Sequence, residues 1–213
     1  MAVHTIVHLL RHGEVHNPDG VLYGRLPDFH LSDLGREMAD RAAKALATRD
    51  VAVVTASPLE RAQETAQPVA TAFGVPVGMD ADLIEADNMF QGQRVGGDDS
   101  VLRQPKYWRY LWNPMTPSWG EPYTQIAARM RQAIRRARDE ARGREAVLVS
   151  HQLPIWITRL DAEERRFVHD PRRRQCGLAS LTSFGFRDNR LVAVSYSEPS
   201  ADLAKRASKV KGA

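Results

Sequence analysis

The stretch that decides the fold is Leu9-Leu10-Arg11-His12-Gly13-Glu14, which ends an apolar run that begins at Val3. A run of this length, rich in apolar and β-branched residues, predicts a buried β-strand. In α/β proteins the carboxyl end of such a strand is where ligands are usually held. An arginine beside a histidine at that position suggests an anion site next to a nucleophile.

Outward from this strand, strand and helix patterns alternate along the chain. Further strands are predicted at residues 51–56, 75–79 and 146–149, and helices at 33–48, 57–73, 121–142 and 154–160. Such alternation indicates a parallel sheet covered on both faces. Two alternating stretches at 178–186 and 191–196 predict a hairpin at the sheet edge. We therefore expect one three-layer α/β/α domain over residues 1–200 with a mostly parallel central sheet.

The limits of the helix over residues 57–73 are suggested by two local signals. Ser57 is expected to be its N-cap, with Pro58 at the first helical position. Pro68 is expected to kink or interrupt it.

Two segments depart from the alternating pattern. Residues 86–120 are expected to form an inserted excursion with one short helix near 104–112. The aromatic cluster at 107–119 suits either packing of this insertion or a lid over a substrate. Residues 201–213 are expected to be a polar, basic and solvated C-terminal tail.

Composition narrows the class of protein. The net charge of +4 comes mostly from the tail, where four basic side chains outnumber one acidic one, which argues against a nucleic-acid partner. A single cysteine, Cys176, excludes an intramolecular disulfide and suits a reducing compartment. No window approaches the roughly 18 apolar residues of a membrane span. We expect a cytoplasmic protein without a membrane partner, and a homodimer stays open.

Four sets of polar side chains are expected to meet at one edge of the sheet. They follow strands or begin helices: Arg11 with His12, Arg61, Glu85 and His151. Two arginines can hold a phosphoryl group by paired hydrogen bonds, and a helix N-terminus favours anions. A neutral histidine can act as nucleophile, and a carboxyl group can protonate the leaving oxygen. Two histidines with carboxylates would also suit zinc, but without a close ligand pair no metal or cofactor is expected.

The chain resembles the histidine phosphatase superfamily, the phosphoglycerate mutase-like proteins, in several ordered motifs. The first is Leu10-Arg11-His12-Gly13-Glu14, with Asn17 shortly after it. Those that follow are Leu31-Ser32-Asp33-Leu34-Gly35, Ser57-Pro58-Leu59-Glu60-Arg61-Ala62-Gln63-Glu64-Thr65-Ala66, Leu83-Ile84-Glu85, Gly120-Glu121 and Val149-Ser150-His151.

The resemblance implies a role for each matched residue. His12 would attack phosphorus and become a phosphohistidine, while Arg11, Arg61 and His151 would surround the phosphoryl oxygens. Asn17 would add a hydrogen bond to them. Glu85 would protonate the leaving alkoxide and then take a proton from water. The substrate would be a phosphorylated small molecule and the activity a metal-independent phosphomonoesterase.

The segment after Glu85 leaves alternatives open. Phosphatase members usually follow this acid with a glycine, an aromatic and an acidic–glycine pair, whereas Ala86-Asp87-Asn88-Met89-Phe90-Gln91-Gly92 stands here. Asp82 and Asp87 are therefore rivals for the acid. The basic and aromatic run of the cofactor-dependent phosphoglycerate mutases is absent, which favours hydrolysis. A mutase, or a phosphate-binding protein without catalysis, remains the alternative.

The basic run Arg172-Arg173-Arg174 has two interpretations. It suits a solvated loop, or a contact to a second anionic group of the substrate.

Overall fold

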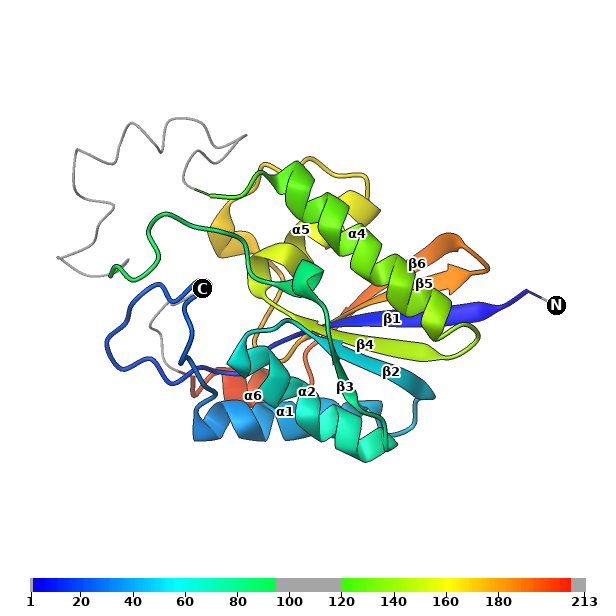
Figure 1. The fold of residues 1–213 in the computed structure, drawn as a ribbon, viewed down its shortest axis with the longest axis horizontal. Helices are drawn as coiled ribbons and strands as arrows, with labels where there is room; N and C mark the ends of the chain where they lie inside the picture. Colours follow the sequence, from blue (N-terminus) through cyan, green and yellow to red (C-terminus); the bar gives the residue numbers. More distant parts are fainter. Residues whose placement is uncertain (1, 95–119, 208–213) are drawn as a thin grey trace.

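The computed structural model describes residues 2–94 and 120–207 and contains a six-stranded sheet in the order β3-β2-β4-β1-β5-β6 (Figure 1). The strands β1 (His4–Arg11), β4 (Glu145–Ser150), β2 (Val51–Ala56) and β3 (Val77–Met79) pair in parallel. The strands β5 (Leu181–Arg187) and β6 (Arg190–Ser197) complete the sheet with antiparallel pairs. The predicted mostly parallel sheet and its edge hairpin are confirmed.

Helices cover both faces of the sheet, as Figure 1 shows. On one face lie α1 (Asp33–Leu46) and α2 (Glu60–Phe73), and on the other α4 (Tyr123–Glu140) and α5 (Gln152–Ala162). Side chains of β4 alternate between them, because successive residues of a strand point to opposite faces. Val147 and Val149 pack in the α1 and α2 layer, and Ala146 and Leu148 in the α4 and α5 layer. The three-layer prediction is confirmed.

Three central strands end side by side. Arg11 is opposite Ser150 in the β1–β4 register, and the His12 backbone N–H donates to the Ser150 carbonyl at 3.1 Å. The Ser57 N–H donates to the Val149 carbonyl at 2.9 Å. The residues that follow β1, β2 and β4 therefore meet at one edge of the sheet.

The prediction that Ser57 caps a helix is wrong. The helix α2 begins at Glu60, and Leu59 precedes it without a side-chain cap. Ser57 instead extends the pairing of β2 toward β4, and its hydroxyl lies 2.8 Å from His151 Nε2. Tertiary contacts have overridden the local capping signal.

The helix α2 also continues through Pro68 to Phe73. Alanine and valine side chains on both sides of the proline are buried, so packing retains the helix. Gly74 ends it in the left-handed conformation (φ 65°), and the Val75 N–H donates to the Ala70 carbonyl at 3.1 Å. Val75 thus closes the helix, and β3 begins two residues later than predicted.

Residues 201–207, the described part of the predicted tail, pack in part against the domain. Residues Ala201–Ala204 form the short helix α6, and Leu203 is buried in the α1 and α2 layer. Asp202 pairs with Arg41 of α1 at 3.0 Å. The packed part of the chain therefore extends beyond residue 200. The predicted helix at 104–112 and the aromatic cluster at 107–119 lie outside the described residues.

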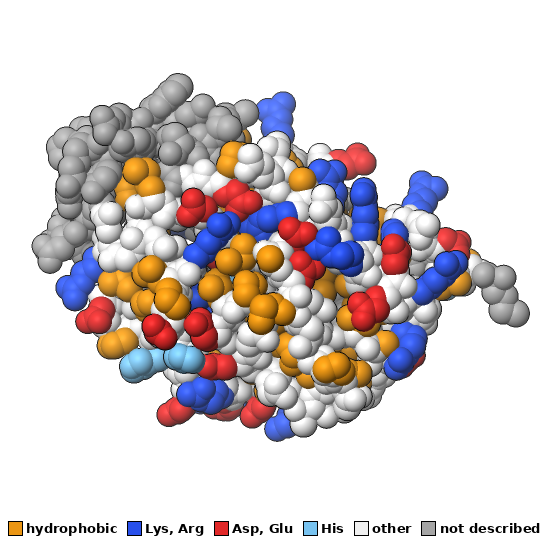
Figure 2. All heavy atoms as spheres, in the orientation of Figure 1, with side chains coloured by type: hydrophobic (Ala, Val, Ile, Leu, Met, Phe, Trp, Pro, Cys, Tyr) orange, Lys and Arg blue, Asp and Glu red, His pale blue; other side chains and the backbone are white. Residues whose placement is uncertain are grey.

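Basic and acidic side chains are interspersed over the described part of the face in Figure 2. On α4, for example, Arg136 pairs with Asp80 at 2.8 Å and with Asp82 at 2.5 Å. In the described ranges, no helix combines the length and the apolar run that a membrane span requires.

Candidate active site

His12 directly follows β1 and is fully buried. Its Nδ1 lies 2.8 Å from the Gly13 carbonyl oxygen, which can only accept a hydrogen bond. Nδ1 therefore carries the proton, and Nε2 keeps the ring's lone pair. The sequence could not identify this acceptor, because it is a backbone group of the next residue.

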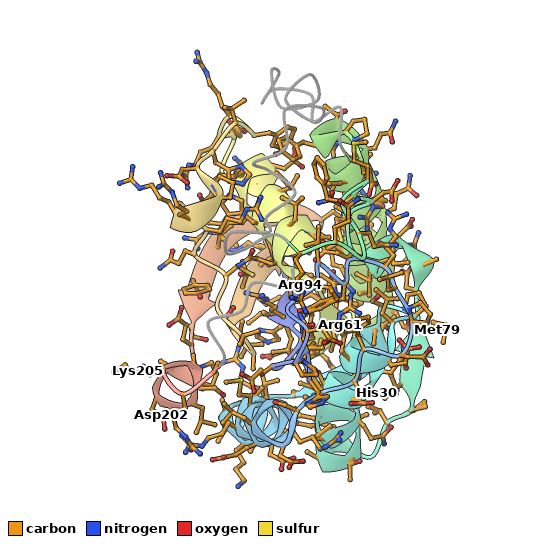
Figure 3. The ribbon with its side chains drawn as sticks, turned by 90° about the vertical axis from the view of Figure 1, so that its left-hand side faces the viewer. His30, Arg61, Met79, Arg94, Asp202 and Lys205 are labelled. Atoms are coloured by element: carbon orange, nitrogen blue, oxygen red, sulfur yellow. The ribbon has the colours of Figure 1, made fainter. Side chains whose placement is uncertain are left out.

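Two arginines flank His12. Arg61, the second residue of α2, is fully buried, and its Nη2 donates to the Gly24 carbonyl at 2.5 Å. Figure 3 shows Arg61 near the centre of the view, whereas Met79 and Asp202 lie at its edges. Arg11, at the end of β1, donates from Nη1 to the Cys176 carbonyl at 2.7 Å. Each guanidinium is thus anchored at one end.

His151 follows β4 and is also fully buried, with its ring centroid 5.2 Å from that of His12. Its Nε2 contacts the Ser57 hydroxyl. The same Ser57 oxygen accepts from the Leu59 N–H at 3.4 Å, so its own proton is free to be donated to His151. With the Ser57 proton donated in this way, Nε2 accepts and Nδ1 is the nitrogen that carries the His151 proton.

Five buried nitrogens of these side chains have no hydrogen-bond partner among the described residues: Arg11 Nε, His12 Nε2, Arg61 Nε, Arg61 Nη1 and His151 Nδ1. Leaving one buried polar group unsatisfied costs about 1–3 kcal/mol, and more for a charged group. A cluster of unsatisfied donors around one lone pair therefore indicates a site built for an anion with several acceptor oxygens.

The electrostatics keep both histidines neutral. Burial lowers the pKa of His12 well below its usual value, and the positive charges of Arg61 and Arg11 lower it further. Burial likewise lowers the pKa of His151, with added effects of Arg61 and His12. A neutral His12 can act as a nucleophile at neutral pH without prior deprotonation.

Glu85 is the acid that the fold brings to this site. It follows the turn η1 (Ala81–Leu83), is 6% exposed, and its Oε1 accepts from the Ala86 N–H at 2.8 Å. Burial raises the pKa of Glu85, although Ala86, Arg61 and Arg11 oppose the shift. A carboxyl group with a raised pKa is suited to donate a proton near neutral pH.

The rival acids differ from Glu85 in their surroundings. Asp82 pairs with Arg136 on the outer surface, and Asp87 is exposed with its carboxylate 3.0 Å from the Asn88 N–H. Glu85 and Asp87 both line one pocket, but of the three acids only Glu85 is buried.

The structure places Asn17 in a bracing position. Its side-chain amide bonds the Val21 backbone at both ends, donating to the carbonyl at 2.9 Å and accepting from the N–H at 3.2 Å. It thereby fixes the loop that leads to Tyr23. A direct bond from Asn17 to a phosphoryl group stays a prediction.

Three further residues shape the site and were not predicted to do so. The ring of Tyr23 lies 4.7 Å from the Arg61 guanidinium, and Ser57 contacts His151. The Thr65 hydroxyl accepts from the Gly13 N–H at 3.1 Å and donates to the Arg61 carbonyl at 2.7 Å. Ser57 did carry a signal, since it directly follows a predicted strand, whereas nothing local marks Tyr23.

Comparison with known proteins identifies the family of the chain. The chain matches the model of the histidine phosphatase superfamily (branch 1) over residues 7–199. It is 56% identical over 201 residues to the uncharacterized protein Rv0525 of Mycobacterium tuberculosis (strain ATCC 25618 / H37Rv). The match covers 94% of this chain and 100% of that protein. It is 29% identical over 152 residues to phosphoserine phosphatase 1 of Hydrogenobacter thermophilus, covering 69% of this chain and 71% of the relative.

The fold leads to the same group of proteins. The structure of mycobacterial glucosyl-3-phosphoglycerate phosphatase Rv2419c superposes with a TM-score of 0.72 at 25% identity, covering 93% of this chain and 98% of that one. Since the family match spans nearly all of the sheet and both histidine motifs, the chain belongs to the histidine phosphatase superfamily.

Proposed function

We propose that the protein is a metal-independent phosphomonoesterase that transfers the phosphoryl group of a small phosphate ester to water through His12. The observation that carries this proposal is a set of four buried nitrogens of Arg11, Arg61 and His151, side chains near His12, that have no partner in the described part of the chain. The phosphatases among its relatives support the same class of reaction.

In the first step, His12 Nε2 attacks phosphorus as the bond to the leaving oxygen breaks. Arg11 and Arg61 donate to the phosphoryl oxygens, and His151 donates from Nδ1. Fixed donors in a buried site stabilise the charge of the transferring group without reorganisation. Glu85, whose pKa is raised by burial, gives its proton to the departing alkoxide.

In the second step, the ionised Glu85 takes a proton from water, which attacks the phosphohistidine. The P–N bond breaks, inorganic phosphate leaves, and both His12 and Glu85 return to their starting protonation states. The overall change is the ester plus water to the alcohol plus phosphate.

The test is product analysis with a panel of phosphate monoesters that includes 4-nitrophenyl phosphate and 3-phosphoglycerate. We expect the wild type to release free phosphate and the His12→Ala variant to release none above background. An isomeric phosphate ester in place of free phosphate would instead assign a mutase. Binding of phosphate without turnover would assign a binding protein.

A further inference from the structure

The pocket that Glu85 lines also contains a cationic side chain, Arg174, which follows the turn η4 (Pro171–Arg173). Its Nε donates to His169 Nε2 at 2.8 Å, and its Nη1 donates to Gln152 Oε1 at 3.3 Å. Both acceptors are uncharged. Within residues 2–94 and 120–207, no carboxylate lies within ion-pair distance of Arg174. This partly buried guanidinium thus keeps its charge available to the pocket.

Arg174 is held in a fixed position. The His169 Nδ1 donates to the Phe167 carbonyl at 2.6 Å, which leaves Nε2 as the acceptor that Arg174 uses. The His169 ring lies 5.8 Å from the ring of Tyr123 and 5.9 Å from that of Trp156. Successive hydrogen bonds from the Phe167 carbonyl to the His169 ring and from that ring to the guanidinium therefore orient Arg174. Such support is expected for a binding group rather than for a solvated one.

Two other arginines near this pocket each have a carboxylate partner, which they share. Glu121, which lines the same pocket, pairs with Arg25 at 2.9 Å and with Arg129 at 2.8 Å. Asp87 is exposed, and its carboxylate is bonded to the Asn88 N–H. Glu85 is the proton donor of the proposed reaction, a role that requires its protonated, uncharged form. Arg174 is accordingly the cation of this wall without a carboxylate partner in the described chain.

We propose that Arg174 binds a carboxylate on the organic part of the substrate, which makes the substrate class phosphate monoesters of hydroxy acids. This inference rests on the proposed function, because it places the ester's organic group in the pocket beside the acid. A guanidinium pairs with a carboxylate through two parallel hydrogen bonds, and one arginine matches one negative charge. The neighbourhood of Glu85 is where the leaving group must lie, so the carboxylate belongs to the leaving alcohol.

The first test compares two esters that differ by one group: 3-phosphoglycerate and glycerol 3-phosphate, in which a hydroxymethyl group replaces the carboxylate. We expect the wild type to favour 3-phosphoglycerate in kcat/KM. Arg174→Gln should lower kcat/KM for 3-phosphoglycerate by about 10- to 100-fold, the usual range for a lost charge-assisted bond, and change glycerol 3-phosphate little.

Arg172 provides a matched control two residues away. It is exposed and pairs with Asp170 at 2.9 Å, so Arg172→Gln removes the same charge from the same loop without touching the pocket. This variant should keep the wild-type preference between the two esters.

His169 tests the positioning of Arg174. His169→Leu removes the acceptor of the guanidinium, and we expect it to raise KM for 3-phosphoglycerate while leaving kcat/KM for glycerol 3-phosphate near the wild-type value. His169→Gln restores an acceptor oxygen and should recover part of the lost affinity. A loss that both variants and both substrates share would assign His169 a purely structural role.

The outcomes separate this inference from the proposed function. If Arg174→Gln lowers both esters equally, or neither, Arg174 does not recognise a carboxylate. A wild type that hydrolyses 4-nitrophenyl phosphate but shows no preference for the carboxylate ester contradicts the inference and leaves the phosphatase proposal standing. A wild type that hydrolyses no ester contradicts both.

Discussion

At the scale of single residues, burial determines the protonation states on which the reaction depends. The same desolvation lowers the pKa of His12 and His151 and raises that of Glu85, so burial favours the uncharged form of all three side chains. A neutral nucleophile beside a neutral acid is the combination that phosphoryl transfer to His12 requires. The arginines supply the fixed positive charge.

The role of Glu85 predicts an effect that depends on the leaving group. Glu85→Gln should reduce kcat/KM for an alkyl phosphate by about 10²–10⁴-fold, the usual contribution of a general acid. The loss should be much smaller for 4-nitrophenyl phosphate, whose phenolate leaves without a proton. Steady-state kinetics with both esters check this. Equal losses would assign Glu85 a structural role.

The same residue predicts the pH dependence of the reaction. Because Glu85 must be protonated to donate, wild-type kcat/KM for an alkyl ester should fall as pH rises through its raised pKa. Because the pKa of His12 is lowered well below 6.5, His12 is still neutral at pH 6.5. Its protonation should therefore cause no loss of kcat/KM near that pH. A pH–rate profile measures this, and the basic fall should disappear in Glu85→Gln.

Much of the site was predictable at this scale because its members follow strands or begin a helix. Arg11, His12 and His151 are marked by the apolar runs that precede them. Tyr23 and the bracing role of Asn17 were not predictable, since each acts through a loop whose path depends on contacts distant in sequence. Ser57 carried two conflicting signals, and the local one was misleading.

At the scale of elements, α1 is packed unusually closely against the loop that follows β1. A Cβ added at Gly35 would lie 2.0 Å from the Glu14 carbonyl oxygen, and one at Gly13 would lie 2.4 Å from the Gly35 carbonyl oxygen. Ser32 caps α1 by accepting from the Gly35 N–H at 2.9 Å and donates to the Glu14 carboxylate. The start of α1 therefore fixes the segment that carries His12.

This contact predicts the sign of a substitution. Helix propensity alone would make Gly35→Ala stabilising by about 1 kcal/mol. Backbone overlap with Glu14 should reverse that sign and destabilise the protein by about 1–3 kcal/mol. Displacement of residues 12–14 should also lower turnover. Denaturant unfolding together with kinetics tests this, and a more stable, fully active variant would refute the packing argument.

The limits of elements were less predictable than their existence. Strand and helix periods identified the alternating order of the elements. Val75, predicted to begin β3, instead bonds to the end of α2, and Pro68 does not end that helix. Both differences arise because tertiary packing outweighs local propensity.

At the scale of the whole molecule, both ends of the described chain take part in one packed unit. β1 lies at the centre of the sheet, and α6 packs in the α1 and α2 layer through Leu203. Composition predicted a solvated tail over residues 201–213, because its charge pattern outweighs one leucine. A single buried side chain is too weak a signal to find in sequence.

Leu203 offers a test of this packing. Leu203→Ala should lower the free energy of unfolding by about 2–4 kcal/mol, as for other buried leucines, with little change in kcat/KM. Asp202→Ala removes only an exposed ion pair with Arg41 and should change the free energy of unfolding much less than Leu203→Ala does. Urea denaturation of the two variants distinguishes a packed α6 from a solvated one, for which both losses would be small.

In the proposed reaction, His12 carries the phosphoryl group between the two steps. The most direct measurement is to mix Glu85→Gln, in which water activation is impaired, with 4-nitrophenyl phosphate, and then to locate the bound phosphoryl group by mass spectrometry after digestion at neutral to alkaline pH. One phosphoryl group on His12, acid-labile and missing when His12→Ala is added to the same variant, is the predicted result. A phosphoryl group on another residue, or wild-type turnover by His12→Ala alone, would contradict the account.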